Sequence, residues 1–127
     1  MGLPKNLRYT EHVWVKVEGN TAVLGVTDYG LQQIKEIVFI DLPKKGQMLR
    51  KGESFTVLES VKWSGHINSP ISGEVVEVNE GLFDEPERLN KDPHGSWICK
   101  VKISDPDELK CLMDSEAAEK WVKENLG

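Results

Sequence analysis

The sequence SFTVLESVKWSGHINSPISGEVVEVN, residues 54–79, decides the fold of this chain. Apolar and β-branched residues predict a strand over Phe55–Val61, and Ser64-Gly65 supplies the residues typical of a turn before a return strand that Pro70 ends. Lys62 falls where the chain reverses, although lysine is a poor strand residue and its ammonium is costly to bury. We therefore predict that Lys62 projects from the tip of a β-hairpin.

The segments on either side of this hairpin also have the character of short strands. Residues His12–Val17 alternate with period two, which predicts one side made of valines and another made of His12, Trp14 and Lys16. Thr21–Val26 returns after a turn, and Glu36–Asp41 is compact enough to be a strand buried on both faces. Further strands are expected at residues 74–78 and 97–103, a short segment between turns at 47–49, and an irregular surface loop at 81–95.

Short helices are predicted at three places, each from a capping signal. Thr27 or Asp28 can cap the first helix, and Asp105-Pro106 begins a second with a capping acid and a proline at the first helical position. Asp114 or Ser115 begins the third. Many short strands with few helices indicate a mostly β protein, either a β-sandwich or a flattened barrel.

Composition limits the class of protein. The chain has 127 residues, 39% of them hydrophobic and 29% charged, which predicts a single globular domain. The net charge of −5 and the scattered basic residues argue against a nucleic-acid partner. No run of about 18 apolar residues predicts a membrane span. Cys99 and Cys111 lack CxxC spacing, so we expect two free thiols in a cytoplasmic protein, which we expect to be a monomer.

An exposed lysine in a turn is ordinary, but the hairpin also suits an attachment point. A carrier needs one amine held away from the body on a rigid stalk, and a lysine with a short acyl chain reaches about 14 Å over about ten bonds. The three histidines His12, His66 and His94 lack metal-ligand spacing, so no metal site is predicted. No catalytic set or phosphate-binding loop appears, so the residues alone do not predict an enzyme.

Several blocks of the sequence resemble the glycine cleavage system H protein family. They are YTEHVWVKVEGNTAVLGVTDYG, IVFIDLP, KGESFTVLESVK, SPISGEVVEVNE and NKDPHGSW, in the family's order. The resemblance covers nearly the whole chain from Tyr9. It implies a hybrid barrel-sandwich fold of the lipoyl- and biotinyl-carrier kind, with short α-helices. The resemblance places the lipoyl-binding core at about 21–103 and the C-terminal helices at about 105–126, within one domain spanning 1–127.

By the same resemblance, Lys62 is similar to the lysine that receives lipoic acid as a covalently bound cofactor. Such a carrier shuttles an aminomethyl group between glycine decarboxylase, which uses pyridoxal phosphate, a tetrahydrofolate-dependent aminomethyltransferase and dihydrolipoyl dehydrogenase. A lipoate ligase or lipoyl transferase would modify Lys62. Glu59, Trp63 and His66 are candidates for the surroundings of the arm, because they lie close to Lys62 in the sequence.

The sequence from Trp63 to Asn68 departs from the usual family pattern, and this motivates two alternatives. One is an H-like lipoate-binding protein that serves sulfur oxidation with heterodisulfide-reductase-like partners. The other is a paralogue that keeps the fold without carrying lipoate. Two related classes fit less well: biotin carriers flank the lysine with methionines, where this chain has Val61 and Trp63, and lipoyl domains of oxo-acid dehydrogenases usually have an acid before the lysine.

Overall fold

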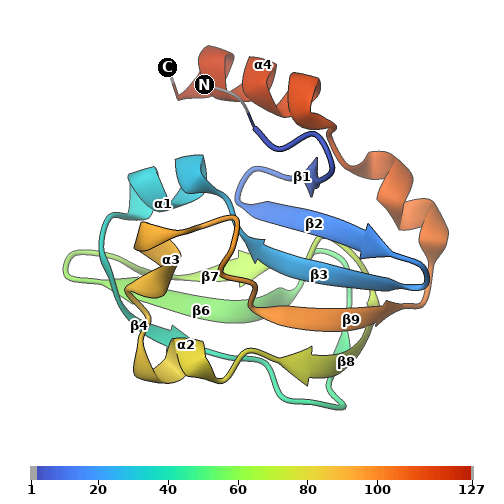
Figure 1. The fold of residues 1–127 in the computed structure, drawn as a ribbon, viewed down its shortest axis with the longest axis horizontal. Coiled ribbons are helices and arrows are strands. Elements are labelled where there is room, and N and C mark those ends of the chain that lie inside the picture. Colours follow the sequence, from blue (N-terminus) through green and yellow to red (C-terminus); the bar gives the residue numbers. More distant parts are fainter. Residues whose placement is uncertain (1–2, 127) are drawn as a thin grey trace.

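The computed structural model describes residues 3–126 and shows a mostly β protein made of two antiparallel sheets with short helices (Figure 1). The larger sheet has six strands, in the order β1 (Arg8–Tyr9), β2 (Val13–Glu18), β3 (Thr21–Val26), β9 (Cys99–Ile103), β8 (Gly73–Val78) and β5 (Met48–Leu49). The smaller sheet has three strands, in the order β4 (Ile37–Asp41), β6 (Ser54–Ser60) and β7 (Ser64–Asn68). This architecture confirms the predicted fold class.

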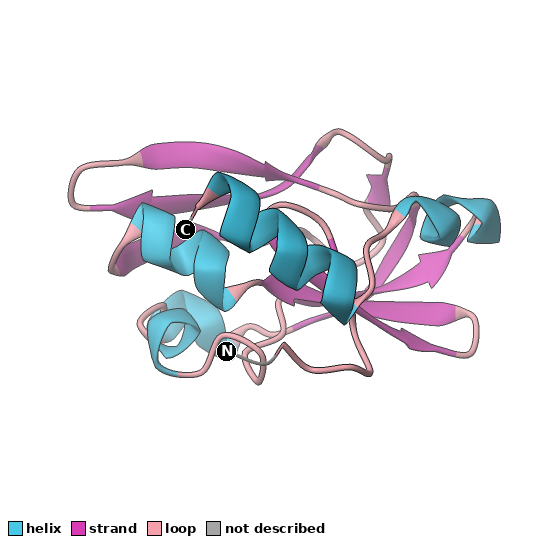
Figure 2. Cartoon of the chain, turned by 90° about the horizontal axis from the view of Figure 1, so that it is seen from above, coloured by secondary structure: helices cyan, strands magenta, loops and turns pink. Residues whose placement is uncertain are grey.

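The helical segments are α1 (Asp28–Ile34), α2 (Gly81–Asp84), α3 (Arg88–Lys91), the 3₁₀ helix η1 (Pro106–Cys111) and α4 (Ser115–Asn125). All three predicted caps are present: the side chains of Thr27, Asp105 and Asp114 accept hydrogen bonds from the amides of Gly30, Asp107 and Ala117. Figure 2 shows α4 lying across the strands near the N-terminal segment. The predicted C-terminal helical segment is therefore confirmed.

The sheets and helices enclose two clusters of buried apolar side chains. The larger cluster joins residues of both sheets, among them Val15, Leu58 and Val75. The smaller cluster lies under α4 and includes Tyr9, Trp14 and Ala118. Burial of these side chains supplies the main driving force for folding, so the two sheets and α4 are held together as layers.

The strand over 36–41 was predicted to be buried on both faces, and this was wrong; burial in β2 also does not follow the alternation of its sequence. In β2, both faces are buried at the start of the strand and neither at its end: Trp14 is buried at 3% exposure, with its ring against Gly25 and its Nε1 donating to Pro93 O, whereas Val17 is 42% exposed. In β4, Val38 and Phe39 are exposed, because β4 is an edge strand with a register shift between Ile37 and Phe39. β4 is therefore buried on one face only.

The segment 81–95 was predicted to be an irregular loop, and this was wrong. It contains α2 and α3, whose Leu82 and Leu89 are fully buried in the larger cluster. Each helix has only four residues, which is too short for a helical repeat to show in the sequence. The helical form of the segment follows from the burial of one leucine in each turn.

The backbone of Lys35 is strained, and its replacement should stabilise the protein. Lys35 ends α1 with φ 80° and ψ −155°, a region that is occupied almost only by glycine. Its amide donates to Leu31 O at 2.7 Å and its carbonyl accepts from Asn90 Nδ2 at 2.9 Å, so this conformation is fixed. Lys35→Gly should raise the free energy of unfolding by about 1 kcal/mol, after the larger unfolded-state entropy of glycine is subtracted.

Urea denaturation measures this effect. Gln33→Gly, in the same helix and also exposed, is the matched control, and it should lower the free energy of unfolding by about 1 kcal/mol. A Lys35→Gly protein less stable than the wild type would contradict the expectation.

Candidate functional site

The candidate site is the tip of the β6–β7 hairpin, which extends beyond the rest of the fold (Figure 1). Strand β6 ends at Ser60 and β7 begins at Ser64, and the Ser60 amide donates to Trp63 O at 2.7 Å to close the turn. Val61 and Lys62 occupy the two positions between these residues. The hairpin predicted from the sequence is present, but the turn lies at Val61–Trp63, whereas Ser64 and Gly65 already belong to β7.

Lys62 itself is exposed, and no residue of the described range 3–126 forms an ion pair with it. Its neighbour Val61 is 82% exposed. The amine therefore stands in solvent with space around it, as an attachment point requires.

The stalk below the tip is rigid because β6 is the middle strand of the smaller sheet. It pairs with β7 on one side and with β4 on the other, where Ile37 lies opposite Ser60. Phe55, Leu58 and Ile67 are buried at 3% exposure or less and fix the hairpin to the core. The position of the Lys62 backbone is therefore set by strand pairing on both sides of β6.

Trp63 lies over the hairpin next to Lys62. A Cβ atom placed on Gly65 would overlap with the six-membered ring of the Trp63 indole, so the ring lies directly against the glycine backbone. The side chain remains 41% exposed. Gly65 was predicted as a turn residue, but its role in the structure is to make room for this ring. The pattern of Trp and Gly two residues apart in a strand was the available signal.

The structure brings Glu59 close to the tip but holds His66 away from it. Glu59 lies opposite Ser64, whose hydroxyl donates to Glu59 Oε1 at 3.5 Å. His66 lies two residues further along β7, opposite Val57, and its Nδ1 is 2.9 Å from Ser54 Oγ.

His66 faces a separate shallow cavity of about 440 Å³. Glu11, His12 and Cys111 also line this cavity, and the sequence did not predict that they would meet. Of the three candidates for the arm's surroundings, only Glu59 and Trp63 therefore lie at the tip.

The remaining reactive side chains lie elsewhere. Burial raises the pKa of the Cys99 thiol to about 12, whereas Cys111 is exposed, and neither forms a disulfide. Burial lowers the pKa of His94, although Asp28 lies 3.9 Å away. Within residues 3–126 no three His, Cys, Asp or Glu side chains are grouped to hold a metal ion. None of the helices in that range is both long and apolar enough to cross a membrane.

Two small sheets that present an exposed lysine at a hairpin tip define a class of proteins, the lipoyl and biotinyl carrier folds. Comparison with known proteins narrows this class. The family model described as glycine cleavage H-protein matches residues 7–125. The chain belongs to the glycine cleavage H-protein family, a family of lipoyl carriers.

Individual relatives agree with this assignment over their full length. The glycine cleavage system H protein of Acidobacterium capsulatum is 43% identical, with 100% of this chain and 99% of the relative covered. The H protein of Halothermothrix orenii is 44% identical, with 98% of each covered. The crystal structure of a glycine cleavage system H protein from Mycobacterium marinum superposes with a TM-score of 0.84 at 28% identity, covering 98% of this chain and 100% of that one.

These comparisons confirm the resemblance found in the sequence and the fold that it implied. They give no support to the sulfur-oxidation alternative, because the relatives described above are named for glycine cleavage.

Proposed function

We propose that Lys62 carries lipoate through an amide bond and that the protein shuttles an aminomethyl group during glycine cleavage. The proposed partners are glycine decarboxylase, aminomethyltransferase and dihydrolipoyl dehydrogenase, with a lipoate ligase or lipoyl transferase to modify Lys62. The observation that carries this proposal is an exposed lysine at the hairpin tip of a chain that matches the H-protein family over residues 7–125. We further propose that residues 1–127 act as one domain.

The tip fits a lipoyl group. The Lys62 amine is solvated, the flanking Val61 is exposed, and no element of the described structure pairs with the amine. Once bound, lipoate supplies a disulfide that can be reduced and can hold a one-carbon unit. The amine must lose its proton to be acylated, and its exposure leaves it accessible to a base on the modifying enzyme.

In this scheme the residues of this chain position the lipoyl arm and do not catalyse the reaction. Pairing of β6 with β4 and β7 fixes the base of the arm, which raises the effective concentration of the arm's end at a partner's active site. Trp63 offers an apolar surface beside the first bonds of the arm. We infer that the chemistry occurs in the partner enzymes, so the protein acts as a carrier subunit.

We also propose that the protein works as a monomer in the cytoplasm. The free Cys111 thiol, which is exposed, is consistent with a reducing compartment.

The test measures lipoylation of the protein first and then glycine-dependent turnover with the lipoylated protein. Wild-type protein incubated with lipoate, ATP and a lipoate ligase should gain the mass of one lipoyl unit, and peptide mapping should place it on Lys62. The loaded protein should then support glycine-dependent NADH formation with the three purified partner enzymes. Lipoylation at Lys62 without glycine turnover would contradict the glycine cleavage role and favour the sulfur-oxidation alternative.

A further inference from the structure

An exposed apolar patch lies beside the hairpin and is not used by the proposed function. We call Val38, Phe39 and Phe83 the aromatic patch; their exposed fractions are 53%, 39% and 58%. The rings of Phe39 and Phe83 meet edge to face, with centroids 5.9 Å apart. Burial of apolar surface is favourable, so an exposed aromatic pair is a candidate contact surface for a partner.

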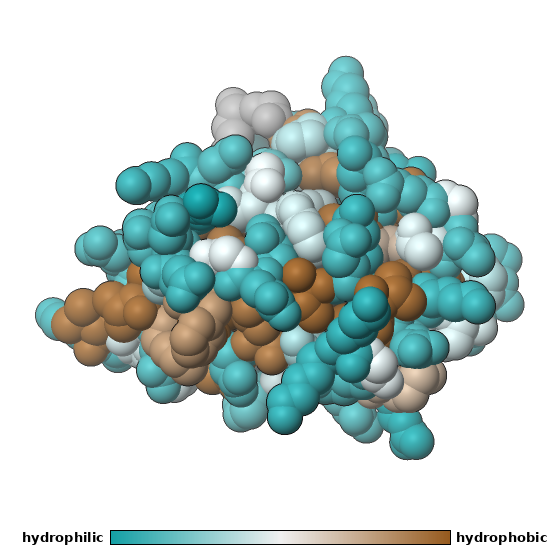
Figure 3. All heavy atoms as spheres, turned by 60° about the horizontal axis from the view of Figure 1, so that its bottom comes forward, coloured by the Kyte–Doolittle hydropathy of each residue, from teal (hydrophilic) through white to brown (hydrophobic). Residues whose placement is uncertain are grey.

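The aromatic patch lies close to Lys62 because β4 pairs with β6. Phe39 lies opposite Glu59, three residues before Lys62. Three residues along a strand and one step across the sheet place the two Cα atoms about 11 Å apart. Helix α2 packs near β4 and brings Phe83 to the same face (Figure 1). Figure 3 shows hydrophobic atoms extending across this face from the hairpin end.

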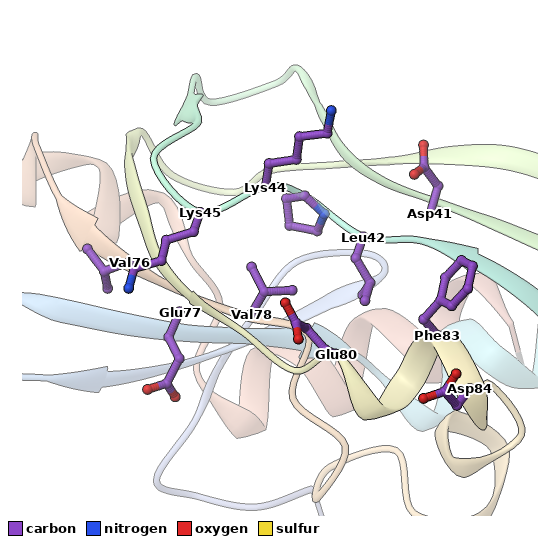
Figure 4. Close-up of a pocket in the computed structure, with 11 residues that line it drawn as sticks. Asp41, Leu42, Lys44, Lys45, Val76, Glu77, Val78, Glu80, Phe83 and Asp84 are labelled. Atoms are coloured by element: carbon purple, nitrogen blue, oxygen red, sulfur yellow. The ribbon is translucent and has the colours of Figure 1, made fainter.

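The surface beyond Phe83 is an acidic groove. It has a volume of about 720 Å³ and runs between the Leu42–Lys45 segment and β8 with α2 (Figure 4). Four carboxylates line it, against two ammonium groups; these residues are Asp41, Glu77, Glu80, Asp84, Lys44 and Lys45. A partner that fits this surface combines an apolar contact with basic side chains at its edge.

The length of the lipoyl arm indicates which partner enzyme contacts the aromatic patch. An enzyme that acts on the Lys62 amine must approach within the length of one lysine side chain, about 6 Å. An enzyme that acts on the end of a loaded arm can work up to about 14 Å from the tip. A standard interface covers about 800 Å² on each partner, equivalent to a circle about 16 Å in radius. An interface of that size centred on the tip reaches the aromatic patch, since Phe39 lies about 11 Å from Lys62.

We propose that the aromatic patch is the docking surface for the enzyme that attaches lipoate to Lys62. This inference rests on the proposed function, since it requires Lys62 to be the attachment site. In the reaction, ATP activates lipoate as lipoyl-adenylate with release of pyrophosphate. The Lys62 amine attacks the acyl carbon, an amide bond forms, AMP leaves, and the amine gives up a proton.

The test measures lipoylation rates at varied concentrations of the unmodified protein, with lipoate ligase, lipoate and ATP. The double variant Phe39→Ser/Phe83→Ser should lower kcat/KM at least tenfold, mainly through a higher KM, because the variant loses the docking contact but keeps the amine. Met48→Ser is the matched control, since Met48 is 62% exposed but lies on β5, at the edge of the other sheet. Met48→Ser should stay within twofold of wild type.

Thermal unfolding of each variant ensures that the comparison is made between folded proteins. Phe39→Ser and Phe83→Ser are also measured singly, so that one folded variant remains if the double variant is unstable. A loss of less than threefold in the folded patch variants, or an equal loss in Met48→Ser, would overturn the docking proposal while leaving Lys62 as the attachment site. A wild-type protein that takes up no lipoate would overturn the proposed function and the docking proposal together.

Discussion

Lys62→Arg protein will take up no lipoate and will support no glycine-dependent turnover. Arginine keeps the positive charge and the length of the side chain, but its guanidinium stays protonated and does not act as an acyl acceptor. The side chain is exposed and has no ion pair within the described structure, so the fold should be unaffected. Intact mass after incubation with ligase, lipoate and ATP measures the loss directly.

Two further variants separate the chemistry of the lysine from its position. The exchange Val61→Lys/Lys62→Val keeps the composition but moves the amine by one residue in the two-residue tip. Because the amine then starts from a different position of the turn, about 3.8 Å away along the backbone and with a different side-chain direction, we expect lipoylation to fall at least tenfold. Lys51→Arg, an exposed lysine in another turn, should be modified like the wild type. Modification of Lys62→Arg at the wild-type level would show that another lysine carries the cofactor.

Gly73→Ala will lower the free energy of unfolding by about 3 kcal/mol. Gly73 is buried at the start of β8, between Leu49 of β5 and Ile103 of β9. A Cβ atom there would overlap with the carbonyl oxygen of Lys102 and would lie 2.6 Å from Val101 Cγ1. The Lys102 oxygen belongs to the backbone of β9, so it cannot move away without disturbing the pairing of β8 with β9.

Gly81→Ala is the matched control for this substitution. A Cβ on Gly81 meets only the Arg88 side chain at 3.4 Å and the Asn79 side chain at 3.6 Å, which are ordinary contacts. Gly81 begins the helix α2, so alanine there should be neutral or slightly stabilising. Equal stability of the two variants in urea denaturation would show that the sheet can relax around a methyl group at position 73.

The strands and the hairpin tip could be predicted from the sequence because their signals are local. The return strand Thr21–Val26 after its turn and the reversal around Lys62 depend on neighbouring residues, and both appear in the structure where the pattern placed them. The cap at Asp114 is local in the same sense. The resemblance to H proteins added the cofactor and the partners, which spacing alone could not give.

The parts that were missed depend on contacts between distant segments. Burial of Trp14 depends on the distant Pro93 segment, whose carbonyl accepts from its Nε1, and the exposure of Phe39 depends on the position of β4 at a sheet edge. The short helices around Leu82 and Leu89 form because the core takes up one side chain from each. The aromatic patch could not be predicted for the same reason, since Phe39 and Phe83 meet only in the folded protein.

The central place of β6 in its sheet has a consequence for the whole set of proposed partners. An arm whose origin cannot shift has a fixed maximum reach. Each enzyme that uses it must then keep its reactive centre no deeper than about 14 Å below the surface that meets the hairpin. Dissimilar active sites would thus share one upper limit on their depth, imposed by the geometry of the carrier.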